Sequence, residues 1–417
     1  MQAANDRDGA YDVVVIGGGP AGATAAHDLA CSGHSVLLLD RAGRIKPCGG
    51  AIPPRLIKDF AIPDHLLVAR ARSARMISPA DRKVDIPIDN GFVGMVNREH
   101  FDEWLRERAA TAGAVRVTGT FDRLEHAGDA LSVVHFKAPS GPSSVRARSV
   151  IGADGARSEV ARQCVPGAER TRCVFAYHEI LRAPGVSAGG ADALGAAGSA
   201  IAPVTAVAGY DDSRCDVYYR GGLSPDFYGW VFPHGDTLSV GTGSADKGFS
   251  LRAATARLRT AAGLSGLETL RREGAPIPMQ PLPRWDDGRG VVLAGDAAGV
   301  VAPASGEGIY YAMAGGRMAA EAAQQFLVSG DARDLKLARK RFMRAHGRVF
   351  CVLGIMQRFW YRNDKRRERF VKICEDRDVQ TLTFDAYMNK ELVRKRPLAH
   401  VRIFLKDIAH LLGLARV

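Results

Sequence analysis

The sequence predicts a protein of the α/β class, in which a mostly parallel sheet is interleaved with an antiparallel-sheet domain and followed by a helical C-terminal extension. Three observations predict this class. A strand–helix–strand pattern with glycines at its first turn occupies residues 11–40, a glycine-rich alternating pattern spans residues 170–245, and a helical pattern runs from residue 308 to the end. The 417 residues allow two or three domains at roughly 100–200 residues each.

The N-terminal unit begins with residues 11–16 (YDVVVI), a β-branched run that predicts a buried parallel strand. Residues 21–32 have helical composition, and residues 35–40 (SVLLLD) predict a second buried strand. Parallel strands joined through a helix require a right-handed crossover, so this unit should be the first βαβ turn of a larger sheet.

A glycine motif, GxGxxG, joins the first strand to the first helix. Gly17 permits the tight turn, Gly19 lets the backbone approach a pyrophosphate, and Gly22 lets the helix pack closely on the strand. Asp40 ends the second strand, where a carboxylate accepts hydrogen bonds from an adenosine ribose. The motif therefore predicts a Rossmann-type dinucleotide site at the N-terminus of the helix.

The remaining elements are predicted from local pattern alone. Residues 60–95 predict loops and strands, and residues 170–245 predict further strands. We also expect helices at 99–112, 251–258 and 266–272, strands at 115–118, 131–136, 149–153 and 291–294, and a loop at 188–200.

Two further motifs each follow a buried strand. Asp154 and Gly155 lie in GADGARS, and Gly295 and Asp296 lie in GDAAG. With GxGxxG they resemble the FAD-dependent hydroxylase-like superfamily. The resemblance implies that Asp296 holds the ribityl chain, that Asp154–Gly155 lies along the cofactor and the nicotinamide approach, and that Arg98 contacts the diphosphate. Because GxGxxG occurs once, a nicotinamide cofactor should have no Rossmann unit of its own.

Residues 46–54 read KPCGGAIPP, and the two glycines after Cys48 permit close backbone approach to a planar ligand. Residues 225–233 read PDFYGWVFP. Tyr228, Trp230 and Phe232 are spaced by two, so on a strand they share one face. That face either walls an apolar pocket or forms a stripe of the hydrophobic core.

These two motifs together resemble the geranylgeranyl reductase family of flavoenzymes. The segments KPCGGAIPPRL, GDAAGVVAPASGEGI and YMNKELVRKRPLAHVRIFLKDIA are similar to its chlorophyll and bacteriochlorophyll branch, and the resemblance spans residues 12 to 412. It implies FAD and NADPH as cofactors. It also implies reduction of a geranylgeranyl chain, carried as the diphosphate or esterified to (bacterio)chlorophyll, at three of its four double bonds to give phytyl.

Motifs and resemblance together give the expected site residues. The expected cofactor-binding residues are Gly17, Gly19, Pro20, Ala21, Gly22, Asp40, Arg41, Cys48, Gly49, Gly50, Arg98, Asp154, Gly155, Gly295, Asp296, Gly306 and Gly308. The expected substrate-binding residues are Tyr228, Trp230, Phe232 and Pro233. No metal site is expected.

The sequence predicts three regions. The FAD-binding domain should comprise residues 11–60, 95–165 and 275–330, the substrate domain residues 61–94 and 166–274, and the basic helical region residues 331–417.

Catalytic roles are expected for Cys48, Tyr228 and Trp230. An isolated alkene has no carbonyl to spread negative charge, so hydride transfer must be accompanied by a proton, and positive charge develops at the tertiary carbon. The aromatic faces of Tyr228 and Trp230 can stabilise that charge. Cys48 is either the proton donor or a packing residue. Because several bonds of one chain must react, residues 170–245 should wall a long apolar tunnel.

The formal net charge of +12 lies at one end of the chain. Residues 331–417 hold 22 Lys and Arg against 10 Asp and Glu, a difference of 12, whereas residues 1–330 hold 35 of each. Basic clusters are expected on helices at residues 339–344 and 365–369, and a third at 394–396 precedes a last helix to about residue 412 with an apolar stripe. This helix either packs on the protein or attaches it to a membrane.

The start of the chain has neither the apolar core of a signal peptide nor the look of a transit peptide. We therefore expect a bacterial protein bound peripherally at the cytoplasmic side of a membrane. Two rival functions stay open, a FAD-dependent aromatic monooxygenase and a non-catalytic flavin-binding scaffold in a pigment-synthesis complex; a halogenase is less favoured because its tryptophan-flanked motif is missing. Nucleic acid binding is rejected, because no recognisable module accompanies the basic charge.

Overall fold

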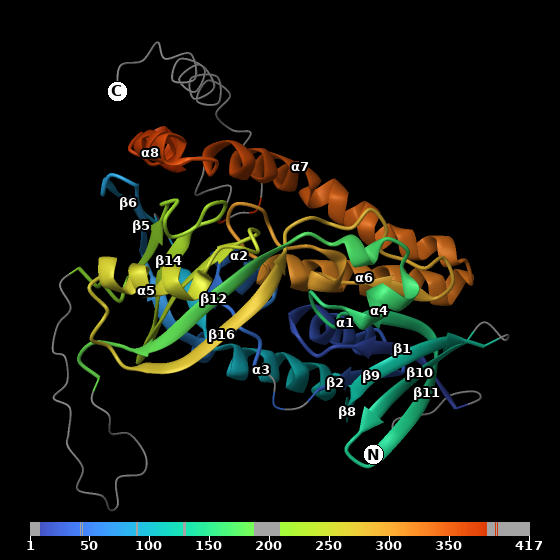
Figure 1. Cartoon of the computed structure of the whole chain (residues 1–417). Coiled ribbons are helices and arrows are strands. Elements are labelled where there is room, and N and C mark those ends of the chain that lie inside the picture. The colour runs from blue at the N-terminus through green and yellow to red at the C-terminus, as the bar shows by residue number, and fades with distance from the viewer. Residues whose placement is uncertain are drawn as a thin grey trace, which may run out of the picture.

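The computed structural model describes residues 9–186 except 42, 44, 89–90 and 128–130, together with residues 209–381, 388 and 390. Two seven-stranded sheets and one three-stranded sheet form the β structure of this part of the chain (Figure 1). The expected loop at 188–200, the basic triplet at 394–396 and the last helix to about residue 412 lie outside the described residues. The α/β class with C-terminal helices is confirmed.

The first sheet has the strand order β8-β2-β1-β11-β10-β9, with β17 also paired to β11. Its long strand β11 pairs in parallel with β1 and β17 and antiparallel with β10. Its strands are β1 (Ala10–Ile16), β2 (Val36–Asp40), β8 (Val115–Thr118), β9 (Thr120–His126), β10 (Ser132–Ala138), β11 (Gly141–Gly152) and β17 (Val291–Leu293). The apolar runs of β1 and β2 are almost fully buried, as parallel strands covered by helices require.

The second sheet has the order β16-β12-β15-β14-β13-β5-β6, and only the β13–β5 pair among these neighbours is parallel. Its strands are β5 (Ser73–Ile77), β6 (Lys83–Pro87), β12 (Cys173–Arg182), β13 (Arg214–Tyr218), β14 (Gly229–His234), β15 (Thr237–Ser244) and β16 (Thr269–Pro278). The small third sheet consists of β3 (Ala51–Ile52), β7 (Val93–Val96) and β4 (Leu67–Ala71).

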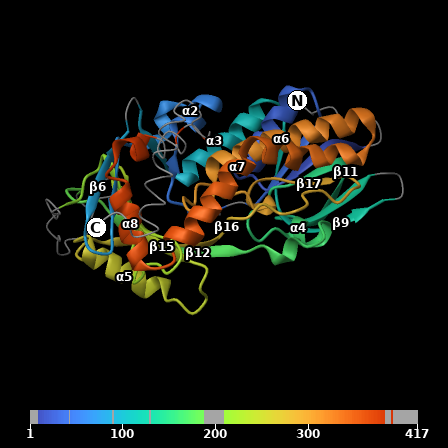
Figure 2. The ribbon, with the colours of Figure 1, turned by 90° about the horizontal axis from the view of Figure 1, so that it is seen from above.

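Eight α-helices lie entirely within the described part of the chain, and residues 377–381 are also helical. They are α1 (Pro20–Cys31), α2 (Pro54–Asp59), α3 (Arg98–Thr111), α4 (Glu159–Cys164), α5 (Leu251–Ala261), α6 (Ile309–Ser329), α7 (Lys336–Trp360) and α8 (Asp364–Ile373). Helix α1 packs against α3 and α6, and α5 packs against β12 and β15. Seen from above, α7 lies beside α6 at one end and reaches α8 at the other (Figure 2). None of the described helices has an apolar stretch long enough to cross a membrane.

Two parts of the sequence prediction need correction. The helix expected at 266–272 is absent, because residues from Thr269 onward belong to β16, which pairs with β12 along most of its length. Strand β9 (TFDRLEH) was not predicted, because it lies at the sheet edge and is largely exposed, so it lacks an apolar pattern. The three domain boundaries stay a prediction.

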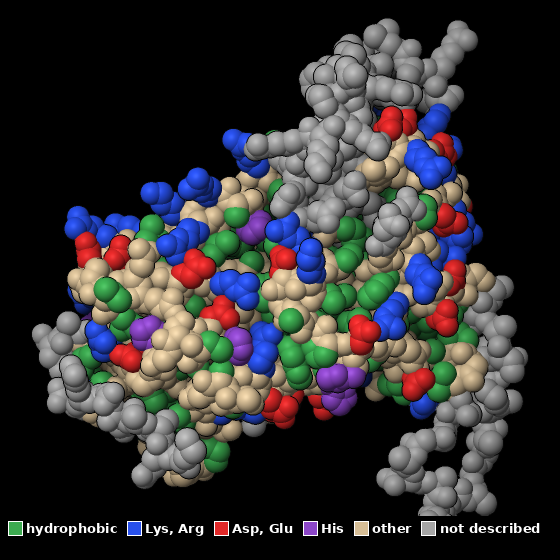
Figure 3. Space-filling model, turned by 180° about the vertical axis from the view of Figure 1, so that it is seen from behind, with side chains coloured by type: hydrophobic (Ala, Val, Ile, Leu, Met, Phe, Trp, Pro, Cys, Tyr) green, Lys and Arg blue, Asp and Glu red, His purple; other side chains and the backbone are tan. Residues whose placement is uncertain are grey.

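One member of the second basic cluster, Arg367 on α8, is buried and does not contribute to a cationic surface. Arg367 is 2% exposed and donates hydrogen bonds to the backbone oxygens of Ser224, Pro225 and Tyr361, and it pairs with Asp364. It therefore joins α8 to the loop before β14. Lys and Arg side chains project along the upper left edge of the molecule in Figure 3, the side on which α6 and α7 lie, and others lie at the upper right.

Candidate functional site

The glycine turn between β1 and α1 has the shape that the motif predicts. A Cβ atom at Gly22 would lie 1.9 Å from the Gly17 backbone oxygen, so only glycine fits where helix and strand meet. Gly17 itself has a φ of +106°. A Cβ atom at Gly19, by contrast, would meet no described atom within 4 Å. Gly17 and Gly22 thus shape the turn, and Gly19 leaves open space before the N-terminus of α1.

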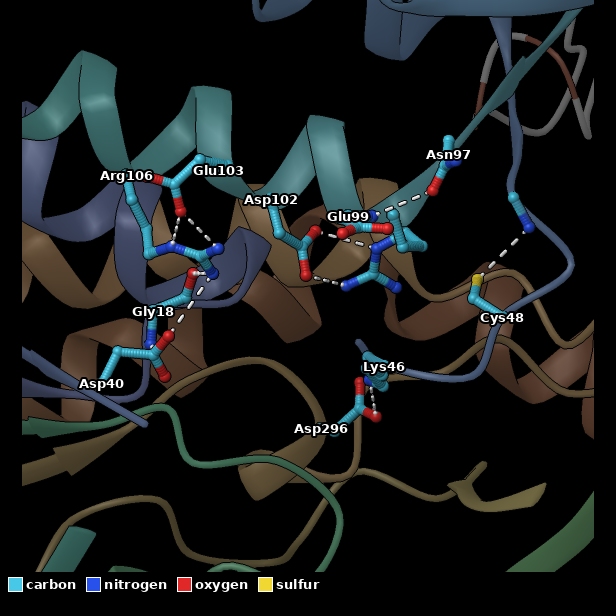
Figure 4. Close-up of polar contacts among 12 residues, drawn as sticks. Gly18, Asp40, Lys46, Cys48, Asn97, Glu99, Asp102, Glu103, Arg106 and Asp296 are labelled. Atoms are coloured by element: carbon cyan, nitrogen blue, oxygen red, sulfur yellow. Dashed lines mark hydrogen bonds and ion pairs between the residues drawn. The ribbon is translucent and has the colours of Figure 1, made fainter. Parts of the chain in front are cut away.

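Asp40 is tied to this turn from the end of β2. Its carboxylate accepts a hydrogen bond of 3.0 Å from the Gly18 backbone N–H (Figure 4). Arg106 of α3 lies 3.3 Å from the other carboxylate oxygen and also donates to the Gly18 carbonyl at 3.2 Å. Glu103 pairs with the same guanidinium. The ribose-binding position expected at Asp40 is therefore held by a charged network that involves α3.

An open groove of about 450 Å³ begins at this turn and continues between the two large sheets. Ten of the expected cofactor-binding residues line it: Gly17, Gly19, Pro20, Ala21, Asp40, Arg41, Arg98, Asp154, Gly155 and Asp296. Gly274, Ala275 and Pro276 of β16 form part of its wall. The lining residues thus come from both large sheets.

Lys46 and Asp296 form an ion pair inside the groove. The Lys46 Nζ lies 2.6 Å from Asp296 Oδ2, and the Asp296 side chain is 7% exposed (Figure 4). Asp296 is held in a single 3-10 turn, η3 (Gly295–Ala298), directly after β17. A Cβ at Gly295 would lie 2.7 Å from the Ala21 Cβ, so this turn packs closely on α1.

Arg98 begins α3 and is 5% exposed. Two hydrogen bonds of 2.8 and 2.7 Å join its guanidinium to Asp102 one turn later. Burial acts to lower the pKa of Arg98, but the charge of Asp102 and the neighbouring Cys48 raise it overall. A permanent positive charge therefore stands in the wall of the groove, next to the Cys48 sulfur.

Asp154 has a structural task that the sequence did not indicate. Its carboxylate accepts hydrogen bonds from the Ser158 hydroxyl at 2.5 Å and from the backbone N–H groups of Glu159 and Val160. It thus holds the first turn of α4, and burial raises its pKa. Asp154 and Gly155 still line the groove through this turn.

A second cavity, of about 110 Å³, opens beside the groove. Lys46, Arg98 and Asp296 line both spaces. Five further expected site residues, which do not line the groove, line the cavity: Cys48, Gly49, Trp230, Gly306 and Gly308. Ligand pockets typically measure about 300–1,000 Å³. The long apolar tunnel expected from residues 170–245 is therefore not formed here by the described residues.

The loop of Cys48, Gly49 and Gly50 presses on β14. A Cβ at Gly50 would lie 2.4 Å from His234 Nε2, and a Cβ at Gly49 would lie 3.3 Å from the Phe232 ring. Residues of β14 thus occupy the space that a side chain at either position would need. This packing requires glycine here, in addition to any approach of a ligand. The Cys48 sulfur accepts a hydrogen bond from Gly50 N–H at 3.4 Å. Burial lowers the pKa of His234 to about 4.

The aromatic residues of PDFYGWVFP share one face, as predicted, but only Trp230 lines the cavity. The ring centroids of neighbouring members lie 6.1 and 6.3 Å apart. Tyr228 stacks on Phe227 and donates a hydrogen bond to the Ser305 carbonyl. Pro233, expected to bind substrate, lies on the opposite face because successive strand residues alternate. Most of the stripe therefore belongs to the core.

Six of the expected site residues line neither the groove nor the cavity. They are Gly22, Gly50, Gly295, Tyr228, Phe232 and Pro233. Lys46, Arg106 and His178 are among the lining residues that the sequence analysis missed. Lys46 adjoins the Cys-Gly-Gly motif, and Arg106 lies two turns after Arg98 on α3, so both left a weak signal. His178 left none, because a single His on a strand is more often a core residue.

FAD fits the groove by the chemistry of its walls. The open backbone at Gly19 faces a helix N-terminus that suits a diphosphate, Asp40 suits a ribose hydroxyl, and Lys46 with Arg98 supplies positive charge farther along. Fold and groove together define a FAD-dependent flavoprotein of the hydroxylase-like class.

Comparisons with known proteins narrow this class. A geranylgeranyl diphosphate reductase of Rhodobacter capsulatus is 59% identical over 97% of this chain and 98% of its own length. The enzyme of that name from Synechocystis is 36% identical over 96% of this chain and 97% of its own length. The chain belongs to the geranylgeranyl diphosphate reductase family. A family described as lycopene cyclase protein also matches residues 12–177.

Solved structures agree in fold. A geranylgeranyl bacteriochlorophyll reductase-like protein of Thermoplasma acidophilum has a TM-score of 0.78 at 21% identity, covering 94% of this chain and 99% of that chain. A flavin-dependent brominase has a TM-score of 0.70 at 17% identity, covering 95% and 99%. At these identities the likeness shows the fold alone.

Proposed function

We propose that this protein is an NADPH-dependent flavoenzyme that reduces geranylgeranyl chains stepwise to phytyl chains. The substrate is geranylgeranyl diphosphate or a geranylgeranylated (bacterio)chlorophyll. The observation that carries the proposal is the continuity of two spaces in a chain of this family: a groove suited to FAD shares Lys46, Arg98 and Asp296 with an aromatic-walled cavity.

The groove residues divide the binding of FAD among them. Gly19 and the N-terminus of α1 receive the diphosphate, and Asp40 receives the adenosine ribose. Asp296 faces the middle of the groove, where its pairing with Lys46 fixes the carboxylate. Arg98 adds positive charge, and its ion pair with Asp102 fixes the position of the guanidinium.

The cavity residues serve the alkene. Bound FAD, once reduced, supplies hydride to one alkene carbon. Trp230 presents an indole to the cavity, and a π face stabilises positive charge at the tertiary carbon by about 0.5–2 kcal/mol. Tyr228 contributes indirectly. Its hydroxyl donates a hydrogen bond to the Ser305 carbonyl and so positions the neighbouring Gly306 of the cavity wall. Cys48 provides the proton from the same wall.

The geometry also limits how the substrate enters. The cavity of about 110 Å³ admits one short segment of a prenyl chain at a time. The double bonds of the substrate therefore react one after another at the same place in the cavity. The rest of the prenyl chain lies outside the cavity at each step.

The experiment follows flavin colour without oxygen. NADPH should bleach the FAD-loaded protein, geranylgeranyl diphosphate or geranylgeranylated bacteriochlorophyll should restore the colour, and product mass should rise in steps of two hydrogens. A product that forms only with oxygen would indicate an aromatic monooxygenase instead. Flavin that NADPH does not bleach would indicate a scaffold.

We further propose that α7 attaches the protein to an anionic membrane surface. Lys336, Lys340, Arg344 and Arg348 are all exposed and spaced by four, so they project from one face of the helix. The exposed side chains of Val352 and Ile355 continue this face, and Ile355 is 62% exposed. A basic stripe that ends in exposed apolar residues suits the interface of a bilayer.

Only part of the basic cluster expected on this helix contributes to that stripe. Arg339 donates to the Leu282 carbonyl, and Arg341 pairs with Glu321 of α6. Both are partly buried, so they hold α7 on the protein. Membrane attachment thus depends on Lys340 and Arg344, together with their neighbours one turn away.

A further inference from the structure

His178 lies in the middle of β12, between β15 and β16. It is 2% exposed, and it lines the cavity of about 110 Å³ together with Cys48 and Trp230. Its ring centroid lies 6.1 Å from that of Trp230. A titratable side chain thus forms part of an otherwise mostly apolar wall, where the proposed reaction takes up protons.

The two ring nitrogens of His178 have different surroundings. Nδ1 lies 2.9 Å from the Ser239 hydroxyl, which also accepts a hydrogen bond from the Trp230 indole at 3.1 Å. Nε2 has no aligned hydrogen bond to a described residue, and a carboxylate oxygen lies 3.2 Å away from it. Buried polar atoms normally have a partner. Nε2 therefore stands beside a charged group without being fixed in an aligned hydrogen bond.

The carboxylate near Nε2 belongs to a residue of the neighbouring strand. Glu273 Oε2 of β16 lies 3.2 Å from His178 Nε2, outside hydrogen-bonding geometry. Arg271, a partly exposed residue two positions earlier, pairs with the same carboxylate. Burial acts to raise the pKa of Glu273, and His178 and Arg271 lower it overall. The Glu273 carboxylate thus lies between the imidazole of His178 and the guanidinium of Arg271 at the surface.

Cys48 alone does not meet the demand for protons. Each reduced double bond takes up one proton, so a thiol that has donated becomes a thiolate that must be protonated again. The Arg98 guanidinium lies beside the Cys48 sulfur. A second proton carrier in the same cavity can return the proton to Cys48 between successive reductions.

We propose that His178, supported by Glu273, returns a proton to Cys48 after each bond is reduced. The inference rests on the proposed function. The Cys48 thiol gives its proton to one alkene carbon as hydride from the reductant reaches the other, so one π bond is replaced by two C–H bonds. The imidazolium of His178 then protonates the Cys48 thiolate, directly or through one water, and regains its proton from solvent past Glu273.

Both side chains line one cavity of about 110 Å³. A cavity of this size holds water, so a water molecule can pass the proton from one side chain to the other.

The first test is the order of products in the anaerobic assay. In His178→Gln the first double bond should be reduced at the wild-type rate by the resident thiol proton, and later bonds should be about 10²–10⁴-fold slower. NADPH should still bleach the flavin normally. Added imidazole should restore the later steps. Later bonds reduced at the wild-type rate would overturn the proposal.

The second test needs neither FAD nor substrate. Iodoacetamide alkylation of Cys48, followed on the Cys48 peptide by mass across a range of pH, should change its pH profile in FAD-free His178→Gln, because two side chains that exchange a proton are coupled in their charge. Unchanged alkylation would argue that the two side chains are not coupled. This result stands even if geranylgeranyl diphosphate fails to recolour the flavin, which would sink only the proposed function.

Two further variants guard against a folding artefact. Glu273→Gln keeps the imidazole and should slow the later bonds less than His178→Gln does. His135→Gln removes a matched His–Glu pair on β10, where Nε2 lies 3.3 Å from Glu125, and that histidine lines neither space. It should leave product order and alkylation unchanged. Equal effects in His135→Gln and His178→Gln would contradict the proposed relay.

Discussion

Lys390 Nζ lies 2.8 Å from Glu307 Oε2, and both side chains are 2% exposed. Glu307 stands between Gly306 and Gly308 of the cavity wall, and its other carboxylate oxygen accepts a hydrogen bond from the Tyr310 N–H at the start of α6. The Lys390 ammonium also lies over the Tyr310 and Tyr311 rings. A residue near the C-terminal end thus holds the loop beside the cavity.

Lys390→Met should destabilise the protein by about 3–5 kcal/mol, because it leaves the Glu307 carboxylate buried without its cation. Urea unfolding of the FAD-free protein measures this change. The double variant with Glu307→Gln should recover most of the loss, since the amide oxygen can still accept from Tyr310 N–H. If the double variant is no more stable than Lys390→Met, the pair does not act as described.

The glycines of the first turn should separate folding from cofactor binding. Gly22→Ala should abolish accumulation of folded protein, because its Cβ would lie 1.9 Å from the Gly17 oxygen. Gly19→Ala should melt like the wild type without FAD, yet bind FAD at least about 10-fold more weakly, because its methyl group fills the space for the diphosphate. Melting curves and flavin titration distinguish the two, and normal FAD affinity in Gly19→Ala would place the diphosphate elsewhere.

Cys48→Ala should keep FAD and be bleached by NADPH at the wild-type rate, while every double bond is reduced about 10²–10⁴-fold more slowly. The reason is loss of the proton donor from the cavity wall. Stopped-flow bleaching and recolouring measure the two half-reactions. Recolouring at a near-normal rate would show that Cys48 is not the proton donor. Cys48 would then be a packing residue whose sulfur accepts a hydrogen bond from the Gly50 N–H.

His234 should make the fold sensitive to acid. Its folded pKa of about 4 lies below the unfolded value of about 6.5, so the unfolded chain binds the extra proton between these values. Stability is therefore unaffected above about pH 6.5 and falls as the pH drops toward 4. Between pH 7 and pH 5 the unfolding free energy of the wild type should fall by about 2 kcal/mol more than that of His234→Gln. If the unfolding free energies of the two proteins fall in parallel with pH, the pKa of His234 is not lowered by folding.

The exposed stripe on α7 should control membrane binding. Replacing Lys340 and Arg344 by Gln removes two charges worth about 1 kcal/mol each at an anionic surface, so partitioning onto phosphatidylglycerol vesicles should fall roughly 30-fold. The matched control replaces Arg123 and Lys137 of β9 and β10 by Gln. Sedimentation with the vesicles measures binding, and equal loss in both double variants would rule out a specific role of α7.

Much of the fold followed from local patterns. The βαβ unit, the strand before GDAAG and the helices α3 and α6 are long or strongly patterned, so burial and periodicity specify them. Strands β9 and β16 were missed or misassigned, because their side chains are mostly polar or partly exposed and only pairing with β10 and β12 makes them strands.

The sequence by itself determined the class of protein and one end of the site. Glycine spacing, the carboxylate ending β2 and the two Asp motifs are local features, since a turn's conformation depends on the residues within it. Only the tertiary structure decided the rest. Lys46 meets Asp296 across 250 residues, Arg106 reaches Asp40 from another helix, and His178 faces the cavity because three strands pack around it. Such pairs have no signature in a single sequence, because their partners are chosen by the packing of sheets and helices.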